Sequence, residues 1–164
     1  MSPGIGCYVK RIKMDEKVKK SAKQIFELAG QTLLLAQSME KELAFLVMVP
    51  EITKNKRLPN LHSMSREVKK LDECTFGQLL EKLRNHAAMN DAMKKILKKA
   101  LTARNLFVHD FFNFHPGWLG KISEHDIMRD ELGEMRNLFE LIYDKLQEES
   151  CRNLKNIGLF TFLQ

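Results

Sequence analysis

An arginine, an asparagine and a histidine interrupt a largely apolar segment, residues 102–112. Arg104, Asn105 and His109 stand there among leucine, valine and phenylalanine. An imidazole exchanges protons near neutral pH, and a guanidinium fork binds phosphate oxygens and offsets charge that develops in a transition state. On a helix Asn105 and His109 are neighbours on one face, and the long side chain of Arg104 can swing toward the same groove. The spacing predicts one wall of a site that another helix or a second subunit completes.

The same residues also have an ordinary structural interpretation. An arginine and a histidine near the C-terminal end of a helix favour the helix dipole, or pair with a carboxylate such as that of Asp110. Both interpretations stay open from these residue types alone. The helical surroundings favour the functional one, because they supply a rigid wall for the three side chains.

Other kinds of chemistry find little support. The remaining histidines, at positions 62, 86, 115 and 125, lack metal-ligand spacing, so we expect no metal and no cofactor. Cys7, Cys74 and Cys151 are odd in number and far apart, which predicts neither a disulfide framework nor a zinc site. No phosphate-binding loop or serine nucleophile elbow is present, and no carboxylates have the spacing of a glycosidase or two-metal site.

Charge favours an anionic partner. Lysine and arginine outnumber aspartate and glutamate by 27 to 21, for a net charge of +6. Four lysines precede the polar segment and are predicted to point outward, where they either form a solvated face or guide RNA to the site: Lys94, Lys95, Lys98 and Lys99. Phe111, Phe112, Phe114 and Trp118 follow it, and we interpret them as core or dimer interface rather than as a platform for stacked bases.

Periodic apolar residues predict an all-α fold, a bundle of four to five helices. The long chain lacks repeats and linkers, so we expect one helical domain over 14–164 after a loosely held arm over 1–13. A first helix is predicted from Met14 to Val49, with Phe26 and Leu33 in its apolar set and Pro50 as its stop. Residues 50–62 are predicted to form a loop, and residues 63–71 a short helix.

Capping residues mark the later helices. Thr75 and Gln78 have the spacing of a capping box, with Leu79, Leu80 and Leu83 as the buried stripe of the helix that follows. Asn90 or Asp91 is expected to cap the next helix, which runs into the polar segment. A turn is predicted over 113–117, then Trp118 and Leu119 as a core plug, then a long helix from Ser123 with Ile127 among its inward residues. The apolar residues 158–163 fit a strand, a last turn or a docking segment.

The stretch Arg104-Asn-Leu-Phe-Val-His109 resembles the R-N-x-x-x-H form of the R-x(4–6)-H signature of HEPN domains. The surroundings are also similar: a long N-terminal helix, a Thr-Phe-Gly-Gln-Leu entry to a middle helix, a lysine-bearing helix before the motif and a long helix after it. The resemblance spans most of residues 14–150. It implies a HEPN-like bundle that pairs as a homodimer, with the motifs of two subunits around one cleft.

Many active members of that family are metal-independent ribonucleases, some of them toxins of toxin–antitoxin or antiviral systems. The resemblance therefore implies an endoribonuclease with Arg104, Asn105 and His109 as catalytic residues, and an antitoxin protein as a further partner. Phe111 stands where some family toxins carry a tyrosine that an antitoxin modifies, so control by that route is not expected here.

Two other functions remain open from the sequence. The chain can be a non-catalytic helical module for dimerisation or interaction, or a regulator that binds RNA without cutting it. The N-terminal residues lack the apolar segment of a signal peptide, and no apolar run reaches the ~20 residues that span a bilayer. We therefore expect a cytoplasmic protein without a membrane partner.

Overall fold

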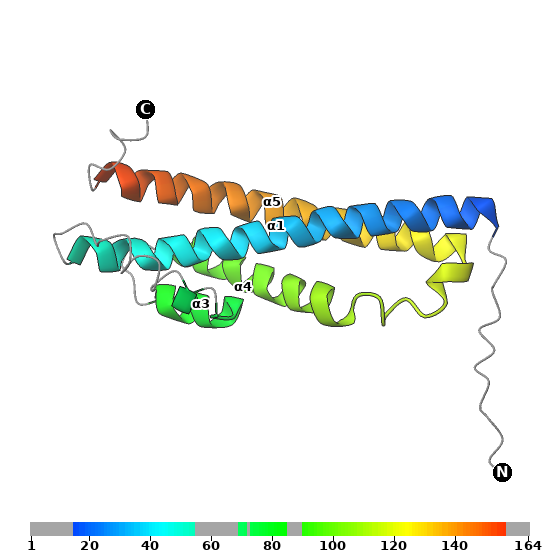
Figure 1. Ribbon diagram of the computed structural model, residues 1–164, viewed down its shortest axis with the longest axis horizontal. Coiled ribbons are helices and arrows are strands. Elements are labelled where there is room, and N and C mark those ends of the chain that lie inside the picture. The colour runs from blue at the N-terminus through cyan, green and yellow to red at the C-terminus, as the bar shows by residue number, and fades with distance from the viewer. Residues whose placement is uncertain (1–14, 55–68, 72, 85–89, 157–164) are drawn as a thin grey trace, which may run out of the picture.

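The computed structural model describes residues 15–54, 69–71, 73–84 and 90–156, which are mostly helical and contain no strand. The elements are α1 (Glu16–Lys54), α3 (Phe76–Arg84), α4 (Asp91–Asn105), the π-helical turn η1 (Leu106–Asp110), the short 3-10 turn η2 (Trp118–Gly120) and α5 (Ile122–Asn156) (Figure 1). The all-α prediction is confirmed. Residues 69–71 are helical, as predicted. Three other predictions concern segments outside the described residues: the arm over 1–13, the rest of the short helix over 63–71 and the tail over 158–163.

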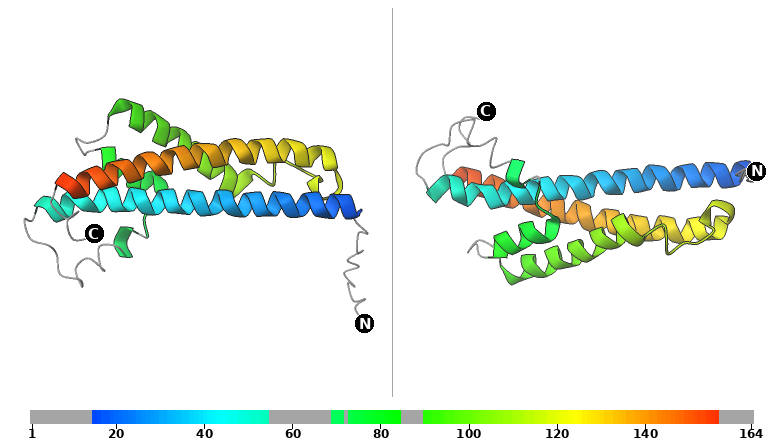
Figure 2. Two further views of the ribbon diagram at one scale, coloured as in Figure 1. Left: turned by 90° about the horizontal axis from the view of Figure 1, so that it is seen from above. Right: turned by 60° about the horizontal axis from the view of Figure 1, so that its bottom comes forward.

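Two long helices, α1 and α5, form the frame of the bundle. They run parallel and side by side in all three views (Figures 1 and 2). Near their N-terminal ends, Arg129 of α5 donates to the hydroxyl of Ser21 on α1 at 3.2 Å. Fully buried side chains from both helices fill the space between them, among them Ile25, Met39, Leu43, Met128, Leu132, Phe139, Ile142 and Leu146.

The shorter helices α3 and α4 begin at the predicted caps. The backbone N–H of Thr75 donates to Gln78 Oε1 at 2.8 Å, and the N–H of Gln78 donates to Thr75 Oγ1 at 3.3 Å, which completes the capping box. Asn90 Oδ1 accepts from the N–H of Met93 at 2.8 Å and caps α4. Of the predicted stripe on α3, Leu79 and Leu83 are buried and Leu80 is half-buried.

The predicted stop at Pro50 is wrong, because α1 continues for another turn to Lys54. A proline inside a helix lacks one hydrogen-bond donor and crowds the preceding turn, which costs about 3 kcal/mol. The four residues before it, 46–49, are all buried. We attribute the continuation to this packing, since tertiary contacts routinely override local preference.

Several apolar residues that the helical period predicts to be buried are exposed to solvent. Phe26 and Leu33 on α1 are 56% and 41% exposed, and Ile127 on α5 is 49% exposed. Leu119 is exposed, which contradicts the predicted plug, whereas Trp118 is half-buried and packs against the core as predicted. Ile25 and Met128, the sequence neighbours of Phe26 and Ile127, are fully buried and occupy the core in their place. No helix within the described ranges is long and apolar enough to cross a membrane.

Candidate functional site

The polar segment spans the junction between α4 and a wider helical turn. α4 ends at Asn105, and the next five residues form η1, in which the N–H of Phe111 donates to the carbonyl of Leu106 at 2.9 Å. This i to i+5 pattern is the hydrogen bond of a π-helical turn. The turn keeps Phe107 and Phe111 buried. It also means that the positions of Asn105 and His109 cannot be taken from a regular α-helix, as the sequence prediction assumed.

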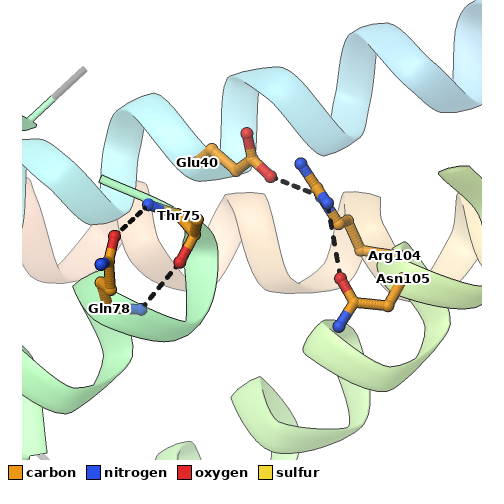
Figure 3. A network of polar contacts seen from close by, with 5 residues as sticks. All are labelled: Glu40, Thr75, Gln78, Arg104 and Asn105. Carbon is orange, nitrogen blue, oxygen red and sulfur yellow. Dashed lines mark hydrogen bonds and ion pairs between the residues drawn. The ribbon is translucent and has the colours of Figure 1, made fainter. Parts of the chain in front are cut away.

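Arg104 lies on the inward side of α4, in register with the buried Leu97 one heptad earlier. A charged group at such a position needs a partner, since desolvation of an unpaired charge is costly. Glu40 of α1 provides it: Arg104 Nε donates to Glu40 Oε1 at 2.7 Å (Figure 3). The carboxylate that pairs with Arg104 is therefore one from across the bundle and not that of Asp110, which the structural alternative offered as an example.

The guanidinium of Arg104 is held from two sides but remains reachable. Its Nη1 donates to Asn105 Oδ1 at 3.4 Å, so Asn105 contacts the arginine as Glu40 does (Figure 3). A guanidinium has five N–H donors, of which these two bonds use two. The Arg104 side chain is 25% exposed and that of Glu40 is 26% exposed. The described residues thus accept from two of the five N–H groups, and the side chain stays partly open to solvent.

His109 is exposed in η1, and within the described part of the chain its ring makes no hydrogen bond or ion pair. Its carbonyl accepts from Asn113 Nδ2 at 3.2 Å, which fastens the backbone of the turn. Arg104 contacts α1 at Glu40, and Phe112 contacts α1 at Phe26 with 6.2 Å between ring centroids. The chain between Arg104 and Phe112 therefore runs in the direction opposite to α1.

The four predicted RNA-binding lysines do not behave alike. Lys95, Lys98 and Lys99 are exposed on the outer face of α4. Lys94 is half-buried, and its Nζ lies 3.3 Å from Asp91 Oδ1 on the same helix. The first three form a basic row that leads along α4 toward Asn105 and His109. A polyanion on this row would meet the imidazole at its end.

The aromatic residues after the motif divide between core and surface. Phe111 is buried as predicted, whereas Phe112 and Phe114 are 37% and 66% exposed. Phe112 and Trp118 form a surface cluster with Phe26, whose ring lies 5.2 Å from that of Trp118. The interpretation as core is thus wrong for Phe112 and Phe114.

Sequence reasoning missed Glu40 and the exposed side of α1. No local signal marks Glu40, because it meets Arg104 only through the packing of α1 on α4. A signal for the exposed side was present: three consecutive leucines, at positions 33–35, span about 200° of a helix and cannot all face one core. Leu33 and Leu34 face solvent, and Leu35 is half-buried.

Two buried histidines have structural roles next to the site. His115 Nε2 lies 2.9 Å from Glu131 Oε2, and its Nδ1 lies 3.7 Å from Glu124 Oε2, which fastens the turn over 113–117 to α5. His125 Nε2 donates to the carbonyl of Trp118 at 2.6 Å. The described residues contain no group of three His, Cys, Asp or Glu side chains suited to a metal ion.

Comparison with models of known families, with curated proteins and with solved structures found no match to this chain. The function must therefore be inferred from the residues of the site. Its components are a partly exposed guanidinium held by Glu40 and Asn105, an exposed imidazole five residues later and three exposed lysines on α4.

Proposed function

We propose that the chain is a metal-independent endoribonuclease of HEPN type that acts as a homodimer and serves as the toxin of a toxin–antitoxin or antiviral system. The proposal is supported chiefly by the difference between two side chains of one short segment, one of them anchored and the other exposed. Arg104 is anchored by Glu40 with donors left over, and His109 is exposed with its ring unengaged by the described residues. Transesterification of RNA requires a group that binds the phosphate and a group that transfers protons, and Arg104 and His109, five residues apart in the chain, offer one of each.

The reaction proceeds without a metal or cofactor. One His109 removes the proton from a ribose 2′-OH, and the 2′-oxygen attacks the adjacent phosphorus while the bond from phosphorus to the 5′-oxygen breaks. A second, protonated His109 delivers a proton to the leaving 5′-oxygen. Arg104 offsets the charge that develops on the phosphoryl oxygens. The products are a 2′,3′-cyclic phosphate and a 5′-hydroxyl end, and DNA is not a substrate because it lacks the nucleophile.

A second subunit is part of the proposal, because one chain supplies one His109 while the reaction needs a base and an acid. Lys95, Lys98 and Lys99 guide the RNA backbone toward the cleft through attraction that falls steeply with salt. Asn105 shares the guanidinium contact and positions Arg104.

The test incubates the purified chain with labelled RNA in EDTA. Wild type should release fragments with 2′,3′-cyclic phosphate ends, and both His109→Ala and Arg104→Ala should lower the rate by about 100-fold or more, which is typical for loss of a proton-transfer or charge-stabilising group. Arg152→Ala, at an exposed site near the end of α5, is the matched arginine control and should cleave like wild type. DNA of the same sequence should stay intact.

Two outcomes would overturn the nuclease. Equal cleavage by wild type and both site variants identifies a contaminating enzyme. No cleavage by folded wild type favours the alternative of a non-catalytic interaction module, for which the exposed rings of Phe26, Phe112 and Phe114 are the supporting observation. If RNA then binds uncut, with an affinity that falls steeply with salt, the chain is an RNA-binding regulator.

A further inference from the structure

Three aromatic side chains from separate parts of the chain meet at the surface, where the turn after η1 contacts α1. Phe26 lies on α1, Phe112 lies two residues after η1, and Trp118 lies in η2, which contacts α1 (Figure 1). The ring centroids are 5.2, 5.4 and 6.2 Å apart, within the range of favourable aromatic pairs. We call Phe26, Phe112 and Trp118 the ring cluster.

The ring cluster is held in place from the core side. The Trp118 carbonyl lies 2.6 Å from Nε2 of the buried His125, and the rings of these two residues are 5.8 Å apart. Phe112 contacts the buried Phe111 at 5.3 Å, and the N–H groups of the next two residues donate to the carbonyl of Asp110 at 2.9 and 3.0 Å. The rings are therefore fixed before a ligand binds, which lowers the entropy cost of binding.

Phe26 exposes the most ring surface of the three. It is 56% exposed and Phe112 is 37% exposed, whereas Trp118 is half-buried. More than half of the Phe26 surface is thus free to receive a planar ligand. A nucleobase is such a ligand, and every unpaired base offers a flat face that stacks on an aromatic side chain.

Positive charge flanks the ring cluster. Lys19 and Lys23, seven and three residues before Phe26, share its face of α1, and Lys121 directly follows η2; all three are exposed. Lys19 and Lys23 pair with carboxylates of their own helix, but both pairs are mostly exposed. Such surface pairs contribute little, so a phosphate can displace them. Lys121 makes no ion pair within the described part of the chain. Rings between cationic groups fit a ligand that carries both bases and phosphates.

The ring cluster is close to the candidate site along the chain. Phe112 lies three residues after His109, which corresponds to about 5 Å of helical rise. A nucleic acid strand that reaches the imidazole therefore comes within reach of the rings. In a duplex the faces of the bases are already stacked on each other inside the helix. Only unpaired bases can use the rings.

We propose that the ring cluster binds unpaired nucleobases by stacking, with the flanking lysines on the phosphates, so that the chain selects single-stranded over duplex nucleic acid. Phe26 is the principal stacking residue, and Phe112 and Trp118 support it. The choice of nucleic acid as the ligand rests on the proposed function. The site itself rests on the exposed rings, their fixed arrangement and the charge around them.

Trp118 is the only tryptophan of the chain, so its fluorescence reports on the ring cluster alone. The full chain is titrated with single-stranded oligodeoxyadenylate of about 12 nucleotides, a ligand that lacks the 2′-OH and stays uncut. Stacking should quench the fluorescence. An abasic oligomer of the same length and charge should bind about tenfold more weakly, and so should the duplex of the oligomer with its complement.

Substitutions at Phe26 separate the effect of the ring from that of apolar character. Phe26→Leu keeps an apolar side chain but removes the ring, so it should raise the Kd for the oligomer about tenfold and leave the Kd for the abasic oligomer unchanged. Phe26→Tyr keeps the ring and should bind like wild type. Tyr143→Leu is the matched control, because Tyr143 lies about 30 Å along α5 from Ile122, and the Kd of this variant should not change.

Two results would overturn the stacking site: equal affinity for the single-stranded and abasic oligomers, or equal affinity of Phe26→Leu and Phe26→Tyr for the oligomer. Trp118 fluorescence that changes with protein concentration alone and ignores the oligomer also overturns it, since a second copy of the chain then covers the rings. RNA cleavage tests the nuclease separately. Stacking without cleavage keeps the site and removes the nuclease, whereas equal cleavage of single-stranded and duplex RNA by wild type and Phe26→Leu does the reverse.

Discussion

Neutralising Glu40 tests whether the contact between α1 and α4 holds Arg104 in place. The two charged groups are 2.7 Å apart and each is about one quarter exposed. An exposed ion pair contributes about 0.2 to 1 kcal/mol, and breaking a fully buried one costs about 3 to 5 kcal/mol. For this intermediate burial we expect Glu40→Gln to lower the free energy of unfolding by about 1 to 2 kcal/mol. The midpoint temperature should then fall by roughly 2–4 °C per kcal/mol for a domain of this size.

A double-mutant cycle isolates the pair. Glu40→Gln, Arg104→Gln and the double variant are compared by chemical denaturation, and the coupling energy should be about 1 kcal/mol. Glu27→Gln is the matched control, because the pair of Glu27 with Lys23 is longer, at 3.6 Å, and mostly exposed. That control should change the free energy of unfolding by less than about 0.5 kcal/mol. A coupling energy below about 0.3 kcal/mol would refute the reasoning, since independent sites add to within that error.

If the proposed nuclease is correct, Glu40→Gln also separates two contributions of Arg104. Without the neighbouring carboxylate the guanidinium attracts phosphate more strongly, so KM for RNA should fall. Without its anchor the fork loses orientation in the transition state, so kcat should fall as well. A variant with wild-type kcat would show that Glu40 stabilises the fold without positioning the site.

Three further substitutions test the fold through their free energies of unfolding, measured by denaturant titration. Thr75→Ala removes the capping box of α3 and should cost about 1 kcal/mol, whereas Thr75→Ser should cost little. His125→Ala leaves a cavity and removes one of the two hydrogen bonds that the Trp118 carbonyl accepts, and should cost about 3 kcal/mol. Met128→Ala should cost about 2–5 kcal/mol because Met128 is fully buried, while Ile127→Ala should cost less than about 1 kcal/mol; equal costs would contradict the assigned face of α5.

The parts of the fold that local chemistry determines were predictable from the sequence. The capping box at Thr75 and the cap at Asn90 use hydrogen bonds within three residues, so short-range pattern is enough to find them. The helical period likewise identified α1, α4 and α5. The end of α1 could not be predicted in this way. The free-energy cost of Pro50 inside the helix is offset by the burial of residues 46–49, and the local sequence does not reveal that burial.

The candidate site shows the same division. The types of Arg104 and His109 and their place near the end of a helix were readable from the chain. Their surroundings were not: the wider turn at η1 depends on how Phe107 and Phe111 enter the core, and Glu40 is 64 residues away from Arg104 in the sequence. Periodicity also cannot choose between adjacent apolar residues such as Ile25 and Phe26, since both fit an apolar face until the partner helix is known.

The position of Arg104 bears on whether the site serves function or stability. Arg104 lies seven residues after the buried Leu97, on the same inward face of α4. An apolar side chain at position 104 would pack there without an ionic partner. Apolar residues in place of a buried ion pair are often neutral or stabilising, so the pair with Glu40 is not needed to hold the bundle together. Sequences depart from the local packing rules mainly at functional sites. If Arg104 binds phosphate as proposed, its guanidinium must be both immobile and accessible, and an arginine that donates through two of its five N–H groups to described residues while 25% of its side chain stays exposed meets both needs.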